Sequence, residues 1–265
     1  MAARPVIRLP WPEGFPEVIV HSDVAHRDKH PNYAAAKGGD ADAALILALN
    51  LLDFGAVDRL RERIRERPCL LLPVIAEETA GFNAIPDAVA QVLSWSLQLP
   101  VLAGEIVQTN KVGHTRARAF QRLVTPAEFD GPVQEGKDHI LVDDHVGLGG
   151  TLANLRGYVE GRGGTVIAMT TLTESRDARR ISLRPDTLAM LKARHGQALD
   201  SFWGSQFGYG IDCLTEVEAQ NLCRQPSLAA IEDFLAKAAV EARRRGLEPA
   251  LGAPEQEVTR QRPAE

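Results

Sequence analysis

One segment of the chain, residues 139–152, combines acidic side chains with a run of glycines. Its sequence, HILVDDHVGLGGTL, is an apolar stretch that ends at Asp143 and Asp144 and is followed by glycines and Thr151. Glycines let the backbone N–H groups of a loop turn inward, and a helix start adds free N–H groups and the positive end of its dipole. Such a loop suits a phosphate group. Carboxylates beside it suit sugar hydroxyls or a hydrated Mg²⁺.

Two common nucleotide-binding motifs do not fit this segment. The P-loop pattern GxxxxGK[ST] needs a lysine where Gly150 stands, and the pattern GxGxxG, begun at Gly147, meets Leu152 in place of its third glycine. What matches is the 5-phosphoribosyl-1-pyrophosphate (PRPP) motif of the type I phosphoribosyltransferases, an apolar strand, two acidic residues and a loop that ends in Gly-Gly-Thr. The chain resembles that family over roughly residues 69–172.

The resemblance implies a role for each part of the segment. Asp143 and Asp144 would face the ribose hydroxyls, stabilise the positive charge that develops on the sugar, and hold Mg²⁺. The 5-phosphate would be bound by the residues that follow, which are Val146, Gly147, Leu148, Gly149, Gly150 and Thr151. A flexible loop at about residues 109–122 would bring Lys111, with Arg116 and Arg118, over the pyrophosphate.

The sequence departs from the family pattern at several positions. Gly147 stands where purine enzymes of the family often carry an acidic residue near the base, and Leu148 stands where a hydroxyl residue is usual. His145 replaces a common aliphatic residue. The expected pyrophosphate loop, residues 76–83, contains Glu77 and Glu78 and no basic residue, an unusual lining for a polyanion unless Mg²⁺ intervenes.

The function that this resemblance implies is transfer of a phosphoribosyl group. The protein would use PRPP and Mg²⁺, release pyrophosphate, and attach the sugar to a nitrogenous, nucleobase-like acceptor whose identity the sequence does not give. The alternative is a regulatory protein that senses PRPP or a nucleotide without turnover. Gly147, Leu148 and the unusual pyrophosphate loop favour the sensor, whereas Lys111 in a mobile loop favours the enzyme.

The elements around the segment predict an α/β fold with an open, mainly parallel sheet and flanking helices. Short, uniformly apolar runs are typical of strands buried on both faces of such a sheet. We expect strands at residues 18–20, 69–76, 101–107, 139–142 and 165–172, and helices at 41–52, 57–67, 85–97, 151–161, 186–194, 216–223 and 227–245. The middle of the chain therefore contains two βαβ units.

Four segments follow from this pattern. They are a proline-rich, extended N-terminal arm with a helical hood segment (1–67), a phosphoribosyltransferase-like core (68–173), a helical C-terminal hood segment (174–245) and a tail that we expect to be disordered (246–265).

Composition excludes several classes of protein. The 265 residues are 45% hydrophobic and 25% charged, as in ordinary globular proteins, and the net charge of −5 gives no global reason to bind nucleic acid or an anionic membrane. Cys69, Cys213 and Cys223 are scattered and contain no CxxC pair, which favours a reducing cytoplasm. No apolar run approaches the ~18 residues of a membrane span. The sequence leaves the oligomeric state open, and a homodimer is one arrangement it permits.

Two further groups of residues have both an ordinary structural interpretation and a functional one. His21, His26 and His30 could bind zinc or substrate, although the segment lacks the HExxH pattern. Trp11, Trp95 and Trp203 are more typical of core or interface positions. The aromatic residues of 202–210 include a ring that could stack on an acceptor base.

Overall fold

The computed structural model describes residues 7–65, 67–78, 81–110 and 119–251, and its centre is a four-stranded sheet. The strand order is β1-β8-β7-β2, and every neighbouring pair is parallel. The strands are β1 (Ile19–Val20), β2 (Cys69–Pro73), β7 (Asp138–Val146) and β8 (Thr165–Glu174). The predicted open, mainly parallel α/β fold is confirmed.

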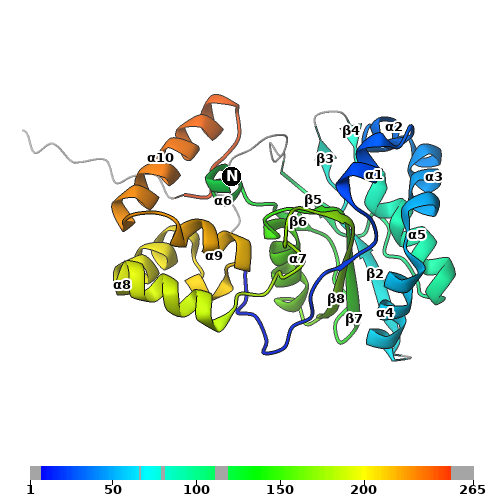
Figure 1. The fold of residues 1–265 in the computed structure, drawn as a ribbon, viewed down its shortest axis with the longest axis horizontal. Coiled ribbons are helices and arrows are strands. Elements are labelled where there is room, and N and C mark those ends of the chain that lie inside the picture. The colour runs from blue at the N-terminus through cyan, green and yellow to red at the C-terminus, as the bar shows by residue number, and fades with distance from the viewer. Residues whose placement is uncertain (1–6, 66, 79–80, 111–118, 252–265) are drawn as a thin grey trace, which may run out of the picture.

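Helices cover both faces of this sheet (Figure 1). Side chains alternate along a strand, so Leu71 of β2 packs with the helices of one face while Leu72 packs with those of the other. One face carries α3 (Ala41–Leu51), α4 (Phe54–Ile64) and α5 (Ile85–Leu97), and the other carries α7 (Gly150–Glu160). Burial on both faces explains why the strands are uniformly apolar.

The N-terminal helices begin where the sequence places capping residues. Asp40 accepts a hydrogen bond from Ala43 N at the start of α3, and Asp53 accepts one from Ala56 N at the start of α4. Two shorter helices, α1 (Val24–Lys29) and α2 (Tyr33–Lys37), precede them. Since α3 and α4 share the core of the sheet, this part of the chain belongs to the α/β layer. The predicted segment boundaries themselves stay a prediction.

The strand predicted at residues 101–107 is largely absent. Val101 makes a single bridge to Leu71, and the regular strand β5 covers only Val107–Gln108, which pairs antiparallel with β6 (Phe129–Asp130). The chain turns at residues 103–105, where Gly104 has φ 72°, so the apolar run does not stay extended beside β2. Two further short strands, β3 (Glu77–Glu78) and β4 (Gly81–Phe82), form an antiparallel hairpin.

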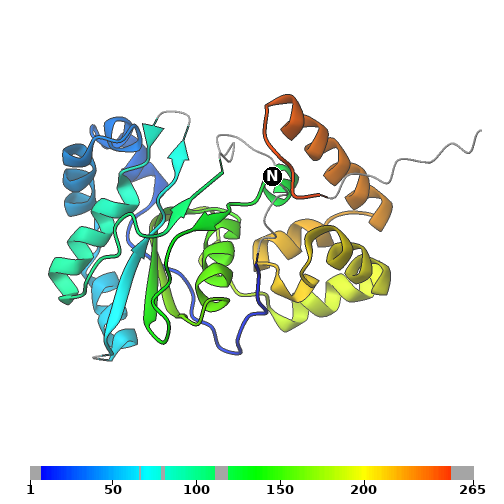
Figure 2. The same ribbon diagram turned by 180° about the vertical axis from the view of Figure 1, so that it is seen from behind.

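The C-terminal helices form a separate group beside the sheet, which we call the hood (Figures 1 and 2). It consists of α8 (Pro185–Phe207), a 3₁₀ turn (Ile211–Cys213), α9 (Glu216–Cys223) and α10 (Leu228–Arg244), with α6 (Ala119–Val124) packed against α10. Trp203, Phe207 and Tyr209 pack on one another in its core. The predicted helical hood segment is therefore helical, with α8 kinked at Gly196.

The N-terminal arm lies between the hood and α7. Trp11 Nε1 donates to Leu214 O of the hood at 2.7 Å, and Arg156 of α7 donates to the carbonyl oxygen of Pro10 at 2.9 Å. Arg156 also lies 4.7 Å from the ring centroid of Trp11. The arm thus joins the two parts of the molecule.

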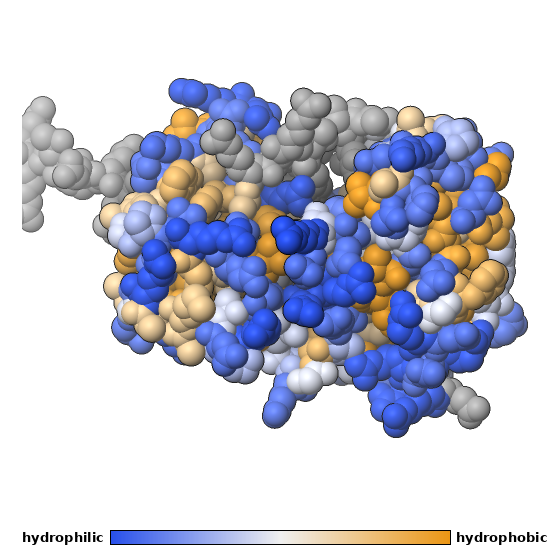
Figure 3. Space-filling model, in the orientation of Figure 1, coloured by the Kyte–Doolittle hydropathy of each residue, from blue (hydrophilic) through white to orange (hydrophobic). Residues whose placement is uncertain are grey.

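The surface between the hood and the α3–α5 layer is mainly hydrophilic, with apolar patches over both (Figure 3). Trp95 of α5 is 55% exposed, so it is not part of the core of this chain, and its predicted place at an interface stays a prediction.

In the described ranges, no helix combines the length and apolar character needed to span a bilayer.

Candidate functional site

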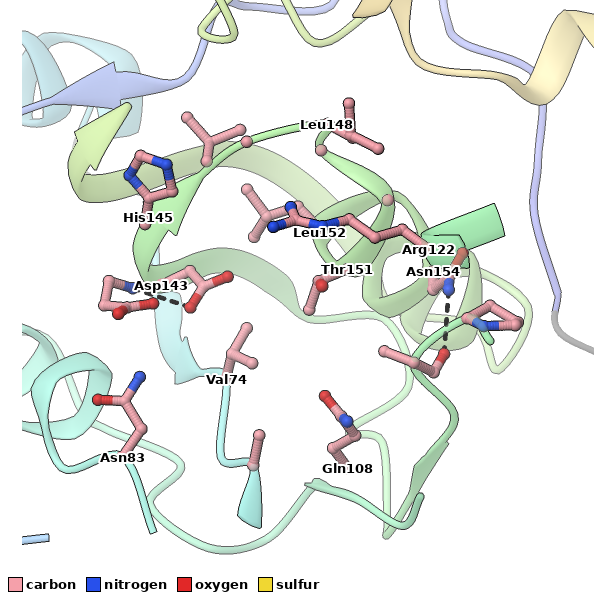
Figure 4. Close-up of a pocket in the computed structure, with 18 of the residues that line it drawn as sticks. Val74, Asn83, Gln108, Arg122, Asp143, His145, Leu148, Thr151, Leu152 and Asn154 are labelled. Atoms are coloured by element: carbon pink, nitrogen blue, oxygen red, sulfur yellow. Dashed lines mark hydrogen bonds between the residues drawn. The ribbon is translucent and has the colours of Figure 1, made fainter. Parts of the chain in front are cut away.

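A cavity of about 270 Å³ opens at the carboxyl ends of β2 and β7, beside the start of α7 (Figure 4). Open parallel sheets bind ligands at this edge, because the loops that follow the strands meet there. The cavity is lined by the acidic pair and the whole glycine-rich loop, Val146 to Thr151. The structure therefore brings together the residues that the sequence singled out as the sugar and phosphate site.

The glycine-rich loop ends in an uncapped helix start. Gly149 is the N-cap of α7 with φ 80°, a left-handed conformation that favours glycine, and as a glycine it has no side chain with which to cap the first N–H groups of the helix. Thr215 of the hood donates its hydroxyl hydrogen to Leu148 O at 2.5 Å, and this bond connects the loop to the hood. This arrangement leaves backbone donors and a positive dipole end at the cavity, as an anion site requires.

The acidic pair lies at the end of β7 and is largely buried. Asp144 Oδ2 accepts a hydrogen bond from Lys37 Nζ of α2 at 2.7 Å, and Asp143 Oδ1 accepts one from Asp144 N at 2.8 Å. Burial and the neighbouring carboxylate raise the pKa of Asp143 well above its ordinary value. Burial acts in the same direction on Asp144, but Lys37 outweighs it and lowers the pKa of that carboxyl.

A buried ion pair from two distant segments forms the wall behind α7. Arg8 of the arm donates to both carboxylate oxygens of Glu218 of α9, at 2.5 and 2.9 Å, and to Asn154 Oδ1 at 2.6 Å. Burial works to lower the pKa of Arg8, but the carboxylate of Glu218 keeps it above its ordinary value. A Cβ at Gly150 would lie 2.8 Å from Glu218 Oε1 and 3.1 Å from Arg8 Nη2, so a larger residue in the glycine-rich loop would displace this buried pair.

His145 lies in a polar cluster at the opposite end of the loop. Its Nδ1 is 2.9 Å from Thr173 Oγ1, its Nε2 is 3.0 Å from Ser175 Oγ, and Arg27 donates to Thr173 Oγ1 at 2.8 Å. Burial and the nearby cation of Arg27 lower the pKa of His145. The imidazole is therefore neutral near pH 7.

Two amides and one more cation complete the lining. Asn83 follows β4, Gln108 is the last residue of β5, and Arg122 reaches in from α6 on the other side of Thr151 (Figure 4). Gln108 Nε2 donates to Asn110 O at 2.7 Å, and its Oε1 has no partner among the described residues. Gln108 Oε1 is thus available to accept from a ligand.

Several predicted residues are not placed in this cavity. Lys111, Arg116 and Arg118 lie outside the described residues. Glu77 and Glu78 form β3, whose partner β4 lies against Gly38 and Gly39 at the end of α2. The predicted roles of these residues in binding pyrophosphate stay predictions.

The histidines and aromatic residues singled out in the sequence form no common site. His21 contacts Thr170 Oγ1, His26 pairs with Asp23, and His30 contacts Asn50, so each imidazole has a different neighbour. The rings of Trp203, Phe207 and Tyr209 fill the hood core and do not line the cavity, which corrects the expectation of a base-stacking ring among them.

The donors in the cavity do not form a complete site for Mg²⁺. Among the described residues, no group of three or more His, Cys, Asp and Glu side chains is placed to hold a metal ion. One oxygen of Asp144 is taken by Lys37 and one of Asp143 by a backbone N–H. Mg²⁺ prefers six oxygen ligands, so the acidic pair could serve only an ion that brings oxygens of its own.

Several residues that line the cavity were not singled out as site residues in the sequence. Lys37, Arg8, Arg122 and Glu218 reach the cavity from elements far from the motif. Lys37 lies 107 positions from its partner Asp144, and Arg8 lies 210 positions from Glu218. Two of them had a local signal. Arg122 ends the predicted flexible loop at residues 109–122, and Glu218 is the fourth residue of the capping box that begins at Thr215.

Relatives of this chain exist among curated proteins, but none names an activity. The chain is 42% identical over 235 residues to "Protein TraN" of Escherichia coli, which covers 89% of this chain and 52% of that protein. It is 40% identical over 153 residues to an uncharacterized protein of Haemophilus influenzae, covering 58% of this chain and 34% of that protein. The chain thus spans about half, or less, of the relatives it matches. No family model matches it.

Solved structures that resemble the fold include phosphoribosyltransferases. A crystal structure of adenine phosphoribosyltransferase has 13% identity and a TM-score of 0.32, covering 51% of this chain and 77% of that one. The same enzyme from Thermoanaerobacter pseudethanolicus has 22% identity and a TM-score of 0.29, with 49% and 73% covered. UMP synthase of Leishmania donovani has 13% identity and a TM-score of 0.29, with 73% and 35% covered. At these TM-scores, the fold class rests on the strand order itself.

Proposed function

We propose that the chain binds PRPP together with Mg²⁺ and transfers the phosphoribosyl group to a nitrogenous acceptor. The observation that carries this proposal is the placement of Asp143 and Asp144 beside the uncapped start of α7 in one cavity. A sugar phosphate needs both parts, because carboxylates accept from its hydroxyls and helical N–H groups donate to its phosphate. The acceptor and the activity are parts of the proposal.

In the proposed reaction, the bond from the anomeric carbon to pyrophosphate breaks and a bond to the acceptor nitrogen forms. Pyrophosphate leaves with the bonding electrons, and the acceptor nitrogen loses a proton. The sugar carries positive charge in the transition state, and the ionised Asp144 would stabilise that charge. Loop residues 147–151 would hold the 5-phosphate and so fix the sugar over the acidic pair. Asp143 and Asp144 would help to hold a Mg²⁺ ion bound to the diphosphate, and such an ion would neutralise part of the negative charge of the leaving group.

Lys37 supplies a positive charge that the predicted pyrophosphate loop lacks. The end of α2 is held against the β3–β4 hairpin, where Ala84 N donates to Ala36 O at 3.2 Å and a Cβ at Gly81 would meet Gly38 O at 2.8 Å. Lys37 therefore projects to Asp144 from a fixed position beside the hairpin. We propose that its ammonium group faces the pyrophosphate of bound PRPP, in addition to the predicted Lys111.

Replacing Lys37 by methionine is expected to make stability depend on pH in a new way. The lowered pKa of Asp144 means that its ion pair stabilises the fold above about pH 4, and that this contribution is lost as the pH falls through the lowered pKa. Without Lys37, two adjacent buried carboxyls lack a counter-charge at neutral pH. We expect Lys37→Met to lower the free energy of unfolding by about 1–2 kcal/mol at pH 7, by less at pH 3.5, and by least once the pH is below the lowered pKa of Asp144.

Urea unfolding of the wild type and Lys37→Met between pH 3.5 and pH 7 measures the difference between their free energies of unfolding. Lys37→Arg should keep most of the stability, and Lys192→Met, at an exposed position of α8, is the matched control. A Lys37→Met loss that is equal at pH 3.5 and pH 7 would show that the ion pair is not its cause.

The alternative function is a sensor that binds PRPP or a nucleotide without turnover. The Lys37–Asp144 pair favours it, because the carboxylate is already partly neutralised before a sugar binds. The experiment that separates the two is incubation of the protein with PRPP, Mg²⁺ and a panel of nitrogenous bases, with pyrophosphate release as the readout. Release that requires a base and is lost in Asp143→Asn/Asp144→Asn supports the enzyme. Tight PRPP binding with no release from any base supports the sensor.

A further inference from the structure

The side chain of Arg122 lies against the first glycine of the phosphate loop. A Cβ at Gly147 would be only 2.8 Å from Arg122 Nη1, so the absent side chain at position 147 leaves the space in which the guanidinium lies. Figure 4 shows this guanidinium across the cavity from Asn83 and Gln108, with Thr151 between them. Residue 147 and residue 122 therefore form one wall of the cavity together.

Arg122 is fixed in this place by the hood. Leu123 and Val124, the next residues of α6, are buried in the hood core, and Ala250 N donates to Val124 O at 2.6 Å. On the outer side, the rings of Phe120 and Phe234 are stacked with centroids 5.1 Å apart. Because α6 is only six residues long, these contacts determine where Arg122 points.

The lining of the cavity contains a small excess of cationic side chains. Its described residues include four cations, Arg8, Arg27, Lys37 and Arg122, and three carboxyl groups, Asp143, Asp144 and Glu218. Arg8, Lys37 and Arg27 are each paired with a carboxylate, Arg27 with Asp28 outside the lining. Arg122 supplies positive charge at the wall beside Gly147.

We propose that Arg122 binds a carboxylate on the acceptor, so that the acceptor is a nitrogenous compound that carries an anion. This inference rests on the proposed phosphoribosyl transfer. The start of α7 would take the 5-phosphate, and Lys37 lies on the side of Asn83 and the β3–β4 hairpin. Arg122 is on the remaining wall, and a guanidinium offers a planar fork of donors that matches a carboxylate.

The test compares ligands that differ only in the carboxylate. Orotate and uracil form one pair, and nicotinate and nicotinamide form another. Each is titrated by calorimetry into the full chain saturated with ribose 5-phosphate, so that the result does not depend on turnover. We expect the wild-type protein to bind one acid more tightly than its neutral partner. Arg122→Gln should weaken binding of that acid roughly ten- to hundredfold.

The controls separate this inference from the proposed function. Arg122→Gln should leave the affinity for the neutral partner and for ribose 5-phosphate unchanged. The affinity of Arg122→Lys for the acid should lie between those of the wild type and Arg122→Gln. Arg224→Gln removes an exposed hood arginine outside the cavity lining and should behave as wild type.

Three results would contradict the inference. Preference for the neutral ligands, or for neither, would exclude a carboxylate acceptor while ribose 5-phosphate binding still supports the proposed function. A variant that loses ribose 5-phosphate as strongly as the acid would make Arg122 a phosphate ligand. Failure of the wild type to bind ribose 5-phosphate or PRPP would overturn the proposed function and the inference with it.

Discussion

Replacing Asp143 and Asp144 together by asparagine is expected to weaken binding of ribose 5-phosphate and PRPP about a hundredfold or more. Hydrogen bonds to charged groups contribute about 1.5–3 kcal/mol each, and the double variant changes two of them. Asparagine keeps the shape of both side chains, and Asp143 already tends to hold a proton because its pKa is raised. We therefore expect the double variant to fold. Calorimetric titration measures the loss, and urea unfolding checks the fold.

The matched control for this prediction lies on the same strand. Asp138 begins β7 at the opposite end of the sheet, 3.7 Å from Arg67, so Asp138→Asn should leave sugar phosphate binding unchanged. If a folded Asp143→Asn/Asp144→Asn protein bound ribose 5-phosphate and PRPP with wild-type affinity, the acidic pair would not be part of the sugar site.

Replacing Glu218 by alanine is expected to destabilise the protein by about 3–5 kcal/mol. The side chains of Arg8 and Glu218 are each only 3% exposed, so the variant leaves a buried guanidinium without its counter-charge. The cost follows from burial of one uncompensated charge rather than from the strength of the pair itself. Urea unfolding at pH 7 measures it.

A second variant distinguishes this explanation from a packing defect. Arg8→Met/Glu218→Met removes both charges and keeps apolar volume, so it should recover most of the lost stability. Glu232→Ala, at an exposed position of α10, should have little effect. If the double variant is as unstable as Glu218→Ala, loss of shape rather than an unpaired charge is the cause.

The sequence predicts the sheet and the local part of the site because both depend on short-range patterns. The helix predicted at residues 85–97 is α5, with Pro86 tolerated in its first turn, and the helix predicted at residues 41–52 is α3. β7 extends through Asp143 and Asp144 to Val146, beyond the apolar run that signalled it. Its polar residues are held by pairing with β8, which a single strand pattern does not show.

The rest of the site depends on tertiary contacts. Arg8 lies in a proline-rich arm and Lys37 near a helix end, and nothing in their neighbours along the chain points to this cavity. Arg122 is the last residue of the predicted flexible loop, but the prediction assigned the cationic role to other residues of that loop. Gly150 illustrates the difference. The motif suggests that Gly150 is needed for its backbone freedom. In the structure, however, the glycine with a left-handed backbone is Gly149. A side chain at Gly150 would instead meet the side chains of Glu218 and Arg8.

The most direct test of phosphoribosyl binding is a calorimetric titration of the wild-type chain with PRPP in the presence of Mg²⁺, with ribose 5-phosphate as competitor. The cavity predicts one saturable site per chain, competition between the two ligands, and loss of that site in Asp143→Asn/Asp144→Asn. No heat of binding with either ligand, or binding that the double variant retains in full, would contradict it.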